Sequence, residues 1–106
     1  MIITPASDIV GYRVVETLGL VRGSTIRARH IGKDIVAALK GIVGGEIEEY
    51  TKMMAEAREQ ALDRMVAQAK DRGANGITDV RFSTSYVMGG AAEIVVYGNG
   101  VALEPV

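Results

Sequence analysis

The strongest hydrophobic pattern in the chain lies between residues 46 and 72. Apolar residues recur there at steps of three and four, the spacing that places side chains on one face of a helix. Gly73 follows in a position that commonly ends a helix. The positive charges of Lys70 and Arg72 fall in the last turn, where they interact favourably with the negative end of the helix dipole. The pattern predicts one long helix over residues 46–72, with its main apolar stripe at Tyr50, Met53, Met54, Ala57, Ala61, Met65 and Ala69.

A second, shorter apolar strip runs along the same segment. It contains Ala55, Leu62 and Val66, which lie about a third of a turn or more from the first stripe at roughly 100° per residue. A helix on one sheet needs only one stripe. The second strip therefore indicates another contact, either with a neighbouring subunit or within the same domain.

The remaining patterns are mostly those of strands. Residues 2–4 form a short β-prone run, and residues 12–29 are rich in Val, Thr, Leu and Ile but contain Gly19 and Gly23, which is typical of a bent or bulged strand or of a hairpin. Residues 77–103 predict a two-stranded antiparallel hairpin with its turn at Gly89-Gly90. Its first strand alternates so that Val80, Phe82, Thr84, Tyr86 and Met88 share one half-buried face. The segment 33–43 has helical spacing and predicts a short helix that ends at Gly44-Gly45.

This order of elements predicts one α+β domain over residues 1–106. We expect two layers, an antiparallel β-sheet and one long helix, because the chain lacks the strand-helix alternation of a doubly wound fold. A small sheet covered on one face leaves much apolar surface exposed. The pattern therefore favours a homo-oligomer.

Composition removes several classes of function. Lys and Arg number 12 and Asp and Glu 13, so no net field attracts nucleic acid or an anionic membrane, and we expect neither as a partner. The absence of cysteine excludes disulfides, thiolate metal sites and thiol nucleophiles. No signal peptide and no long apolar run is present, which favours a cytoplasmic location.

The stretch GIVGGEIEEY, residues 41–50, contains the main candidate site. Glu46, Glu48 and Glu49 fall in the first turn of the predicted long helix, where the helix dipole stabilises each carboxylate by a few tenths to about 1 kcal/mol. That stabilisation explains the three glutamates without a ligand. If several subunits brought them together, however, a divalent metal cation would be the ligand that such a set of oxygens prefers.

Two further groups could belong to a binding site. His30, the sole histidine, is four residues from Asp34, and together they supply half of a metal site at most. Tyr50, Met53 and Met54 could instead line an apolar pocket between subunits, although methionines at helical spacing usually fill a core. We do not expect an enzyme, because the serines of 83–85 have no histidine nearby and His30 is the one plausible base at neutral pH.

Four ordered pieces give the chain a family resemblance: GLVRGSTIRARHIGKDI, ALKGIVGGEIEEYTKMMAEAREQALDRM, AKDRGANGITDVRFSTS and GGAAEIVVYGNGVAL. Over residues 2–103 the chain resembles the YbjQ-like family of small prokaryotic proteins, to which heavy-metal binding has been attributed without established ligand residues. The resemblance implies a fold related to dodecin subunits, in which a helix packs on an antiparallel sheet and extra short strands promote assembly into a pentamer.

These observations lead to two functional hypotheses. The first is a cytoplasmic homo-oligomer, a pentamer, that binds a metal cation near its subunit interfaces through residues among Glu46, Glu48, Glu49, His30 and Asp34. The alternative is a structural scaffold or small-ligand-binding oligomer, with an apolar pocket between subunits lined by Tyr50, Met53 and Met54.

Overall fold

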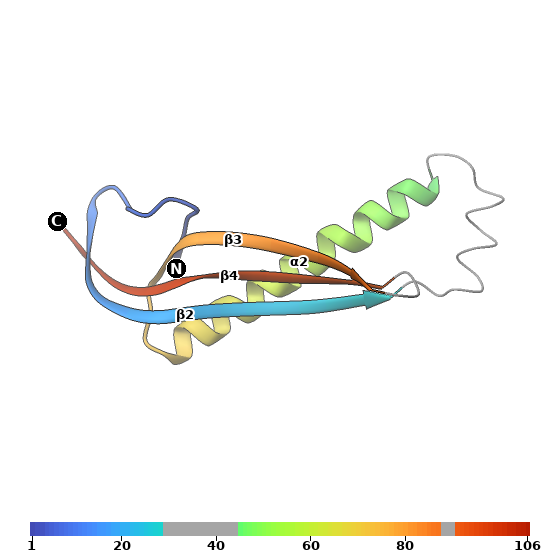
Figure 1. The fold of residues 1–106 in the computed structure, drawn as a ribbon. Helices are drawn as coiled ribbons and strands as arrows, with labels where there is room; N and C mark the ends of the chain where they lie inside the picture. Colours follow the sequence, from blue (N-terminus) through green and yellow to red (C-terminus); the bar gives the residue numbers. More distant parts are fainter. Residues whose placement is uncertain (29–44, 88–90) are drawn as a thin grey trace.

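The computed structural model describes residues 1–28, 45–87 and 91–106 as four strands and one helix (Figure 1). The predicted short helix at 33–43 and the turn at Gly89-Gly90 lie outside these residues. The long helix begins and ends one residue earlier than predicted. The elements are β1 (Ile2–Ile3), β2 (Tyr12–Ala28), α2 (Gly45–Asp71), β3 (Gly76–Val87) and β4 (Ala91–Pro105).

The strands form one sheet in the order β1-β3-β4-β2. β4 pairs antiparallel with both β3 and β2, which confirms the predicted hairpin and the antiparallel arrangement of the three long strands. β1 pairs parallel with β3, with Ile2 opposite Gly76, so the sheet is mixed rather than purely antiparallel. β1 and β3 are not joined by a tight turn, so no hairpin forces β1 to run antiparallel to β3.

β2 is one continuous bent strand, which settles the choice between a bent strand and a hairpin for residues 12–29. It pairs with β4 from Tyr12 to Ala28, with shifts of register at Val14/Glu16 and at Thr17/Gly19. Gly19 has φ 93°, a conformation in which a residue without a side chain is favoured. The glycine that suggested an interruption thus marks an irregularity within the strand.

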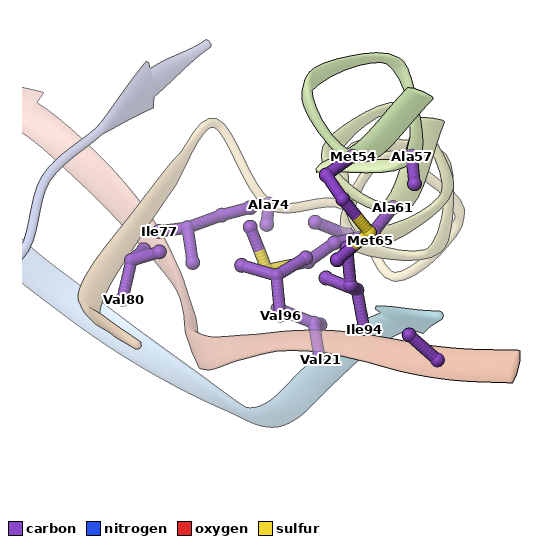
Figure 2. Close-up of a cluster of buried hydrophobic side chains, with 12 residues drawn as sticks. Val21, Met54, Ala57, Ala61, Met65, Ala74, Ile77, Val80, Ile94 and Val96 are labelled. Carbon is purple, nitrogen blue, oxygen red and sulfur yellow. The ribbon is translucent and has the colours of Figure 1, made fainter. Parts of the chain in front are cut away.

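α2 lies across one face of the sheet, mainly on β2 and less on β4 (Figure 1). α2 approaches β2 closely: the Thr25 hydroxyl donates to the Ala57 carbonyl at 3.1 Å, and the helix backbone at Ala61 lies beside Gly23. The larger core side chains come from the helix and from the strands beneath it (Figure 2). The fully buried ones are Met65, Ile77, Ile94, Val21 and Val96.

The prediction of a half-buried β3 is correct for its first half and wrong for its second. Val80 is buried in the core, whereas Phe82 is 46% exposed and Tyr86 is 74% exposed. The alternation of side chains is present, but α2 covers β2 and β4 and leaves this part of β3 open. The exposure of Tyr86 comes from the placement of the helix.

The second apolar strip of α2 is explained partly within the chain. Leu62 and Val66 are half-buried and pack against the core cluster, while Ala55 is exposed. A neighbouring subunit is therefore not required to account for Leu62 and Val66.

Candidate functional site

The three predicted cation ligands on the helix lie at its beginning. Because α2 starts at Gly45, Glu46, Glu48 and Glu49 belong to its first turn, as the sequence predicts. The structure describes the backbone of these residues and of Tyr50 but not their side chains. His30 and Asp34 lie outside the described residues, so the structure does not bring the proposed metal ligands together or separate them.

The described part of the chain offers no other candidate metal site. Its residues contain no group of three or more His, Cys, Asp or Glu side chains close enough to hold one metal ion. A metal site built on the glutamates would need its full ligand set from the start of α2, from residues beyond the described ones, or from another subunit.

The two candidate methionines differ in their surroundings. Met53 is half-buried against the core cluster. Met54 is 7% exposed and lines a cavity of 280 Å³ between the N-terminal half of α2 and the far half of β3. The other lining residues are Thr51 and Arg58 from α2 and Thr84 and Tyr86 from β3.

This cavity combines apolar and polar groups. Met54 and the ring of Tyr86 supply apolar surface, the two threonines supply hydroxyls, and Arg58 supplies a guanidinium group. Such a lining suits a ligand with a small apolar body and a polar or anionic group. Met54 was a candidate from the sequence, whereas Thr84 and Tyr86 were not, although their alternation with Val80 places all three on one face of β3.

A larger hollow lies at the free edge of β2. It has a volume of 620 Å³ and is lined by Arg22, Gly23, Ser24, Arg64, Gln68, Glu93 and Val95. Two of its polar side chains are already engaged: Arg64 donates to the Ser24 carbonyl at 2.6 Å, and Gln68 accepts from the Arg22 amide at 2.8 Å. Arg72 likewise donates to the Leu20 carbonyl. These side chains tie α2 to the backbone of β2.

Asp79 forms the most connected polar cluster of the described residues. Its carboxylate accepts hydrogen bonds from the Ser7 hydroxyl at 2.7 Å, the Thr78 hydroxyl at 3.0 Å and the Asn99 amide at 3.2 Å. Hydrogen bonds from Ser7 and Thr78 lower the pKa of the Asp79 carboxyl below its ordinary value of 3.8. Asp79 also has φ 56°, at the irregular point in the pairing of β3 with β4. The cluster joins the N-terminal segment to β3.

The described helix gives no indication of a membrane crossing, since no part of α2 has the length of apolar sequence that a bilayer requires.

Comparison with known proteins identifies the family. A family model described as "Putative heavy-metal-binding", YbjQ_1, matches residues 1–104. The chain belongs to this family. The YbjQ_1 match confirms the resemblance seen in the sequence, and the family has no known catalytic activity.

Relatives of this YbjQ_1 chain occur in both bacteria and archaea. A UPF0145 protein of Dehalococcoides mccartyi is 58% identical over 104 residues, which cover 98% of this chain and 100% of the relative. A UPF0145 protein of Archaeoglobus fulgidus is 53% identical over 104 residues (98% and 96%), and one of Pyrococcus abyssi is 52% identical over 104 residues (98% and 91%).

The fold is also similar to a solved one. The crystal structure of a DUF74-family protein of unknown function from Pediococcus pentosaceus matches with a TM-score of 0.68 over 98% of each chain. The two sequences are 16% identical, so this likeness supports the α+β fold alone.

Proposed function

We propose that the protein is a non-enzymatic homo-oligomer, a pentamer, that binds a divalent metal cation near its subunit interfaces. The observation that carries the proposal is the start of α2 at Gly45, which places Glu46, Glu48 and Glu49 in one helical turn of a YbjQ_1 chain. Carboxylate oxygens are suitable ligands for hard divalent ions.

Helical spacing explains why several subunits would take part. Positions 46 and 49 are three residues apart and share a face, whereas position 48 is about 200° from position 46 at roughly 100° per residue. One chain therefore contributes two adjacent carboxylate positions at most. His30 and Asp34 are the other candidates to complete the ligand set, from the same subunit or from a neighbour.

The test is native mass spectrometry of the protein, first stripped with a chelator and then titrated with individual divalent metal salts. We expect the loaded protein to retain ions at micromolar free metal, and we expect Glu46→Gln with Glu49→Gln to abolish that binding. Glu59→Gln is the matched control, because Glu59 is an exposed glutamate later on the same helix. Absence of micromolar binding by the unmodified protein would overturn the cation proposal, and unchanged binding by His30→Ala would exclude the imidazole as a ligand.

The cavity beside Met54 favours a second candidate, an oligomer that binds a small ligand rather than a metal. Its lining by Met54, Tyr86 and Arg58 suits an apolar molecule with an anionic group. The volume of 280 Å³ is close to the lower end of the usual range for ligand pockets, about 300–1,000 Å³.

A fluorescent naphthalene sulfonate has this combination of groups and can serve as the probe. We expect Tyr86→Ala to weaken its binding several-fold. Tyr97→Ala is the control, because Tyr97 lies between the buried Val96 and Gly98 and therefore faces the side of the sheet away from α2. Equal loss of binding in both variants would exclude the cavity as the site.

A further inference from the structure

The floor of the 620 Å³ hollow beside β2 lies on the face of the sheet away from α2. Arg22 and Ser24 alternate along β2 with buried residues that face the helix, and Glu93 and Val95 alternate in the same way along β4. Ser24 is directly opposite Val95 in the pairing of the two strands, and Glu93 is the next residue of β4 on that face. These four side chains therefore share one surface.

Two side chains of α2 reach round the edge of β2 and form the wall of the hollow. Arg64 donates to the Ser24 carbonyl at 2.6 Å, and Gln68 accepts from the Arg22 amide at 2.8 Å. A guanidinium group has five N–H donors. The bond to Ser24 therefore holds the Arg64 side chain in place and leaves donors of the same group for another acceptor.

The backbone amide of Ser24 is a further donor at this edge. Amide directions alternate along a strand, and the Arg22 amide points outward to Gln68. Because the pairing with β4 is regular here, the Ser24 amide, two residues on, points outward as well. It has no acceptor among the described residues.

One end of the hollow thus carries several donors and no acidic partner for them. The donors are the guanidinium groups of Arg22 and Arg64 and the hydroxyl and amide of Ser24. Neither guanidinium group forms an ion pair with an acidic side chain of the described residues. Arginines together with hydroxyl and amide donors are well suited to bind the oxygens of a phosphate group.

Glu93 gives the other end of the floor a different character. Diagonal neighbours on paired strands, such as Ser24 and Glu93, are about 7–8 Å apart, which leaves room for the body of a small molecule. The Glu93 carboxylate repels a second anionic group and accepts hydrogen bonds from hydroxyls. The volume of 620 Å³ lies within the usual range for ligand pockets, about 300–1,000 Å³, and exceeds what a phosphate ion alone requires.

We propose that this hollow binds a small phosphate ester with a hydroxyl-bearing body. The phosphate group contacts Arg22, Ser24 and Arg64, and a hydroxyl of the body donates to Glu93. The site shares no residue with the proposed metal ligands or with the cavity beside Met54. Its failure would therefore leave the proposed function standing, and the reverse also holds.

Ribose 5-phosphate carries both kinds of group and is the probe for isothermal titration calorimetry, with ribose as the comparison ligand. We expect the chelator-stripped protein to bind ribose 5-phosphate with a submillimolar Kd and to show no measurable binding of ribose. Arg22→Gln should weaken the binding of ribose 5-phosphate at least about tenfold, because hydrogen bonds to a charged group are lost. This substitution keeps the bond to Gln68, which uses the backbone amide.

Arg13→Gln is the matched control. Arg13 is an exposed arginine near the other end of β2, where it pairs with Glu104 at 3.2 Å. Its substitution should leave the binding of ribose 5-phosphate unchanged. Absence of binding by the unmodified protein, or an equal effect of Arg22→Gln and Arg13→Gln, would overturn the proposed site.

Glu93→Ala separates the ester from free phosphate. Removal of the carboxylate should weaken the binding of ribose 5-phosphate several-fold, because the acceptor for its hydroxyls is lost. Binding of inorganic phosphate should stay the same or become tighter, because a negative charge is removed. If inorganic phosphate binds as tightly as the ester and Glu93→Ala weakens neither, the ester is rejected as the ligand.

Nuclear magnetic resonance of the unmodified protein supplies a measurement that does not depend on how the variants fold. The amide resonance of Ser24 should shift during titration with ribose 5-phosphate, whereas that of Thr84, in the cavity beside Met54, should not. Shifts at Thr84 without shifts at Ser24 would assign the binding to that cavity and overturn the proposal.

Discussion

Gly23 sets the distance between α2 and β2. A Cβ atom at this position would lie 2.1 Å from the Ala61 carbonyl oxygen and 2.5 Å from the Met65 amide nitrogen. Both are backbone atoms of the helix, so a side-chain rotation cannot relieve the contact. The alanine stripe of α2 and this glycine together allow the helix to rest directly on the strand.

We therefore expect Gly23→Ala to lower the free energy of unfolding by about 3 kcal/mol, the upper part of the range for overpacked cores. Ser24→Ala, at the next residue of the same strand but exposed, should change it by less than about 0.5 kcal/mol. Urea unfolding of the two variants checks the difference. Similar midpoints would show that the helix can move away from β2 at little cost.

Asp79 links acid stability to the attachment of the N-terminal segment. Hydrogen bonds lower the pKa of its carboxyl in the folded chain, so the ionised form is favoured by folding. The ionised carboxylate therefore stabilises the folded chain at pH values above its ordinary pKa of 3.8. This stabilisation is lost as the pH falls from 3.8 through the lower pKa of the folded state.

In Asp79→Asn the residue no longer titrates, and asparagine also tolerates the positive φ. The unmodified protein should thus be more stable than Asp79→Asn at pH 6, and the difference should shrink near pH 3. Urea unfolding at the two pH values measures it. If the free energy of unfolding fell equally in both proteins between pH 6 and pH 3, other carboxylates would account for the acid sensitivity.

The alternating pattern of residues 77–88 did not predict the irregular backbone at Asp79. The pattern is that of a regular strand, whereas the structure has a shift of register between Thr78 and Arg81. Such a shift depends on the partner strand and on the N-terminal segment that binds there, and neither is visible in the local sequence.

At the scale of elements, α2 protects the free edge of β2. Gln68 accepts a hydrogen bond from the Arg22 amide, between the contacts that Arg64 and Arg72 make to neighbouring carbonyls. A helix that covers a sheet in this way both packs on its face and satisfies its edge.

Gln68→Ala should leave the Arg22 amide without its protein acceptor. We expect the free energy of unfolding to fall by about 1 kcal/mol and the exchange of the Arg22 amide to accelerate. Lys70→Ala, exposed in the last turn of the same helix, should change neither quantity appreciably. If the Arg22 amide exchanges at the unmodified rate in Gln68→Ala, the contact does not protect the edge.

The elements themselves were largely predictable. The bounds of α2 came within one residue because a 27-residue helix carries a long periodic signal and Gly73, with φ 85°, ends it. The parallel pairing of β1 and the exposure of Phe82 were not predictable. Both depend on where distant segments lie in space, which alternation within one strand does not encode.

At the scale of the whole molecule, the exposed ring of Tyr86 links the fold to assembly. Tyr86 is 74% exposed, so an isolated chain gains little stability from it. The proposed homo-oligomer would bury exposed apolar surface of this kind between its subunits.

Tyr86→Glu should consequently dissociate the oligomer while changing the free energy of unfolding of the isolated chain by about 0.5 kcal/mol or less. Tyr86→Phe keeps the ring and should preserve the oligomer. Analytical ultracentrifugation measures the two masses. An oligomer that tolerates glutamate at this position would place the subunit interface elsewhere.

Prediction of the candidate sites was limited by distance along the chain. The sequence placed Met53 and Met54 on the apolar stripe of α2, and in the structure Met54 lines a cavity within the chain. Thr84 and Tyr86 come from a strand some thirty residues later, and they meet Met54 only because the helix crosses the sheet diagonally. The metal ligands Glu46, Glu48, Glu49, His30 and Asp34 stay predictions.

The bonds from α2 to β2 have a consequence for sequence divergence. Arg64, Gln68 and Arg72 bind carbonyl and amide groups of the strand, not its side chains. The strand can therefore exchange the side chains at residues 20, 22 and 24 without losing these contacts, unless proline removes the Arg22 amide. Substitutions at these strand positions should therefore be tolerated by the fold, whereas substitutions at Arg64, Gln68 or Arg72 would remove the contacts. Contacts of this kind are one means by which an α+β fold can persist between proteins that share only 16% of their residues.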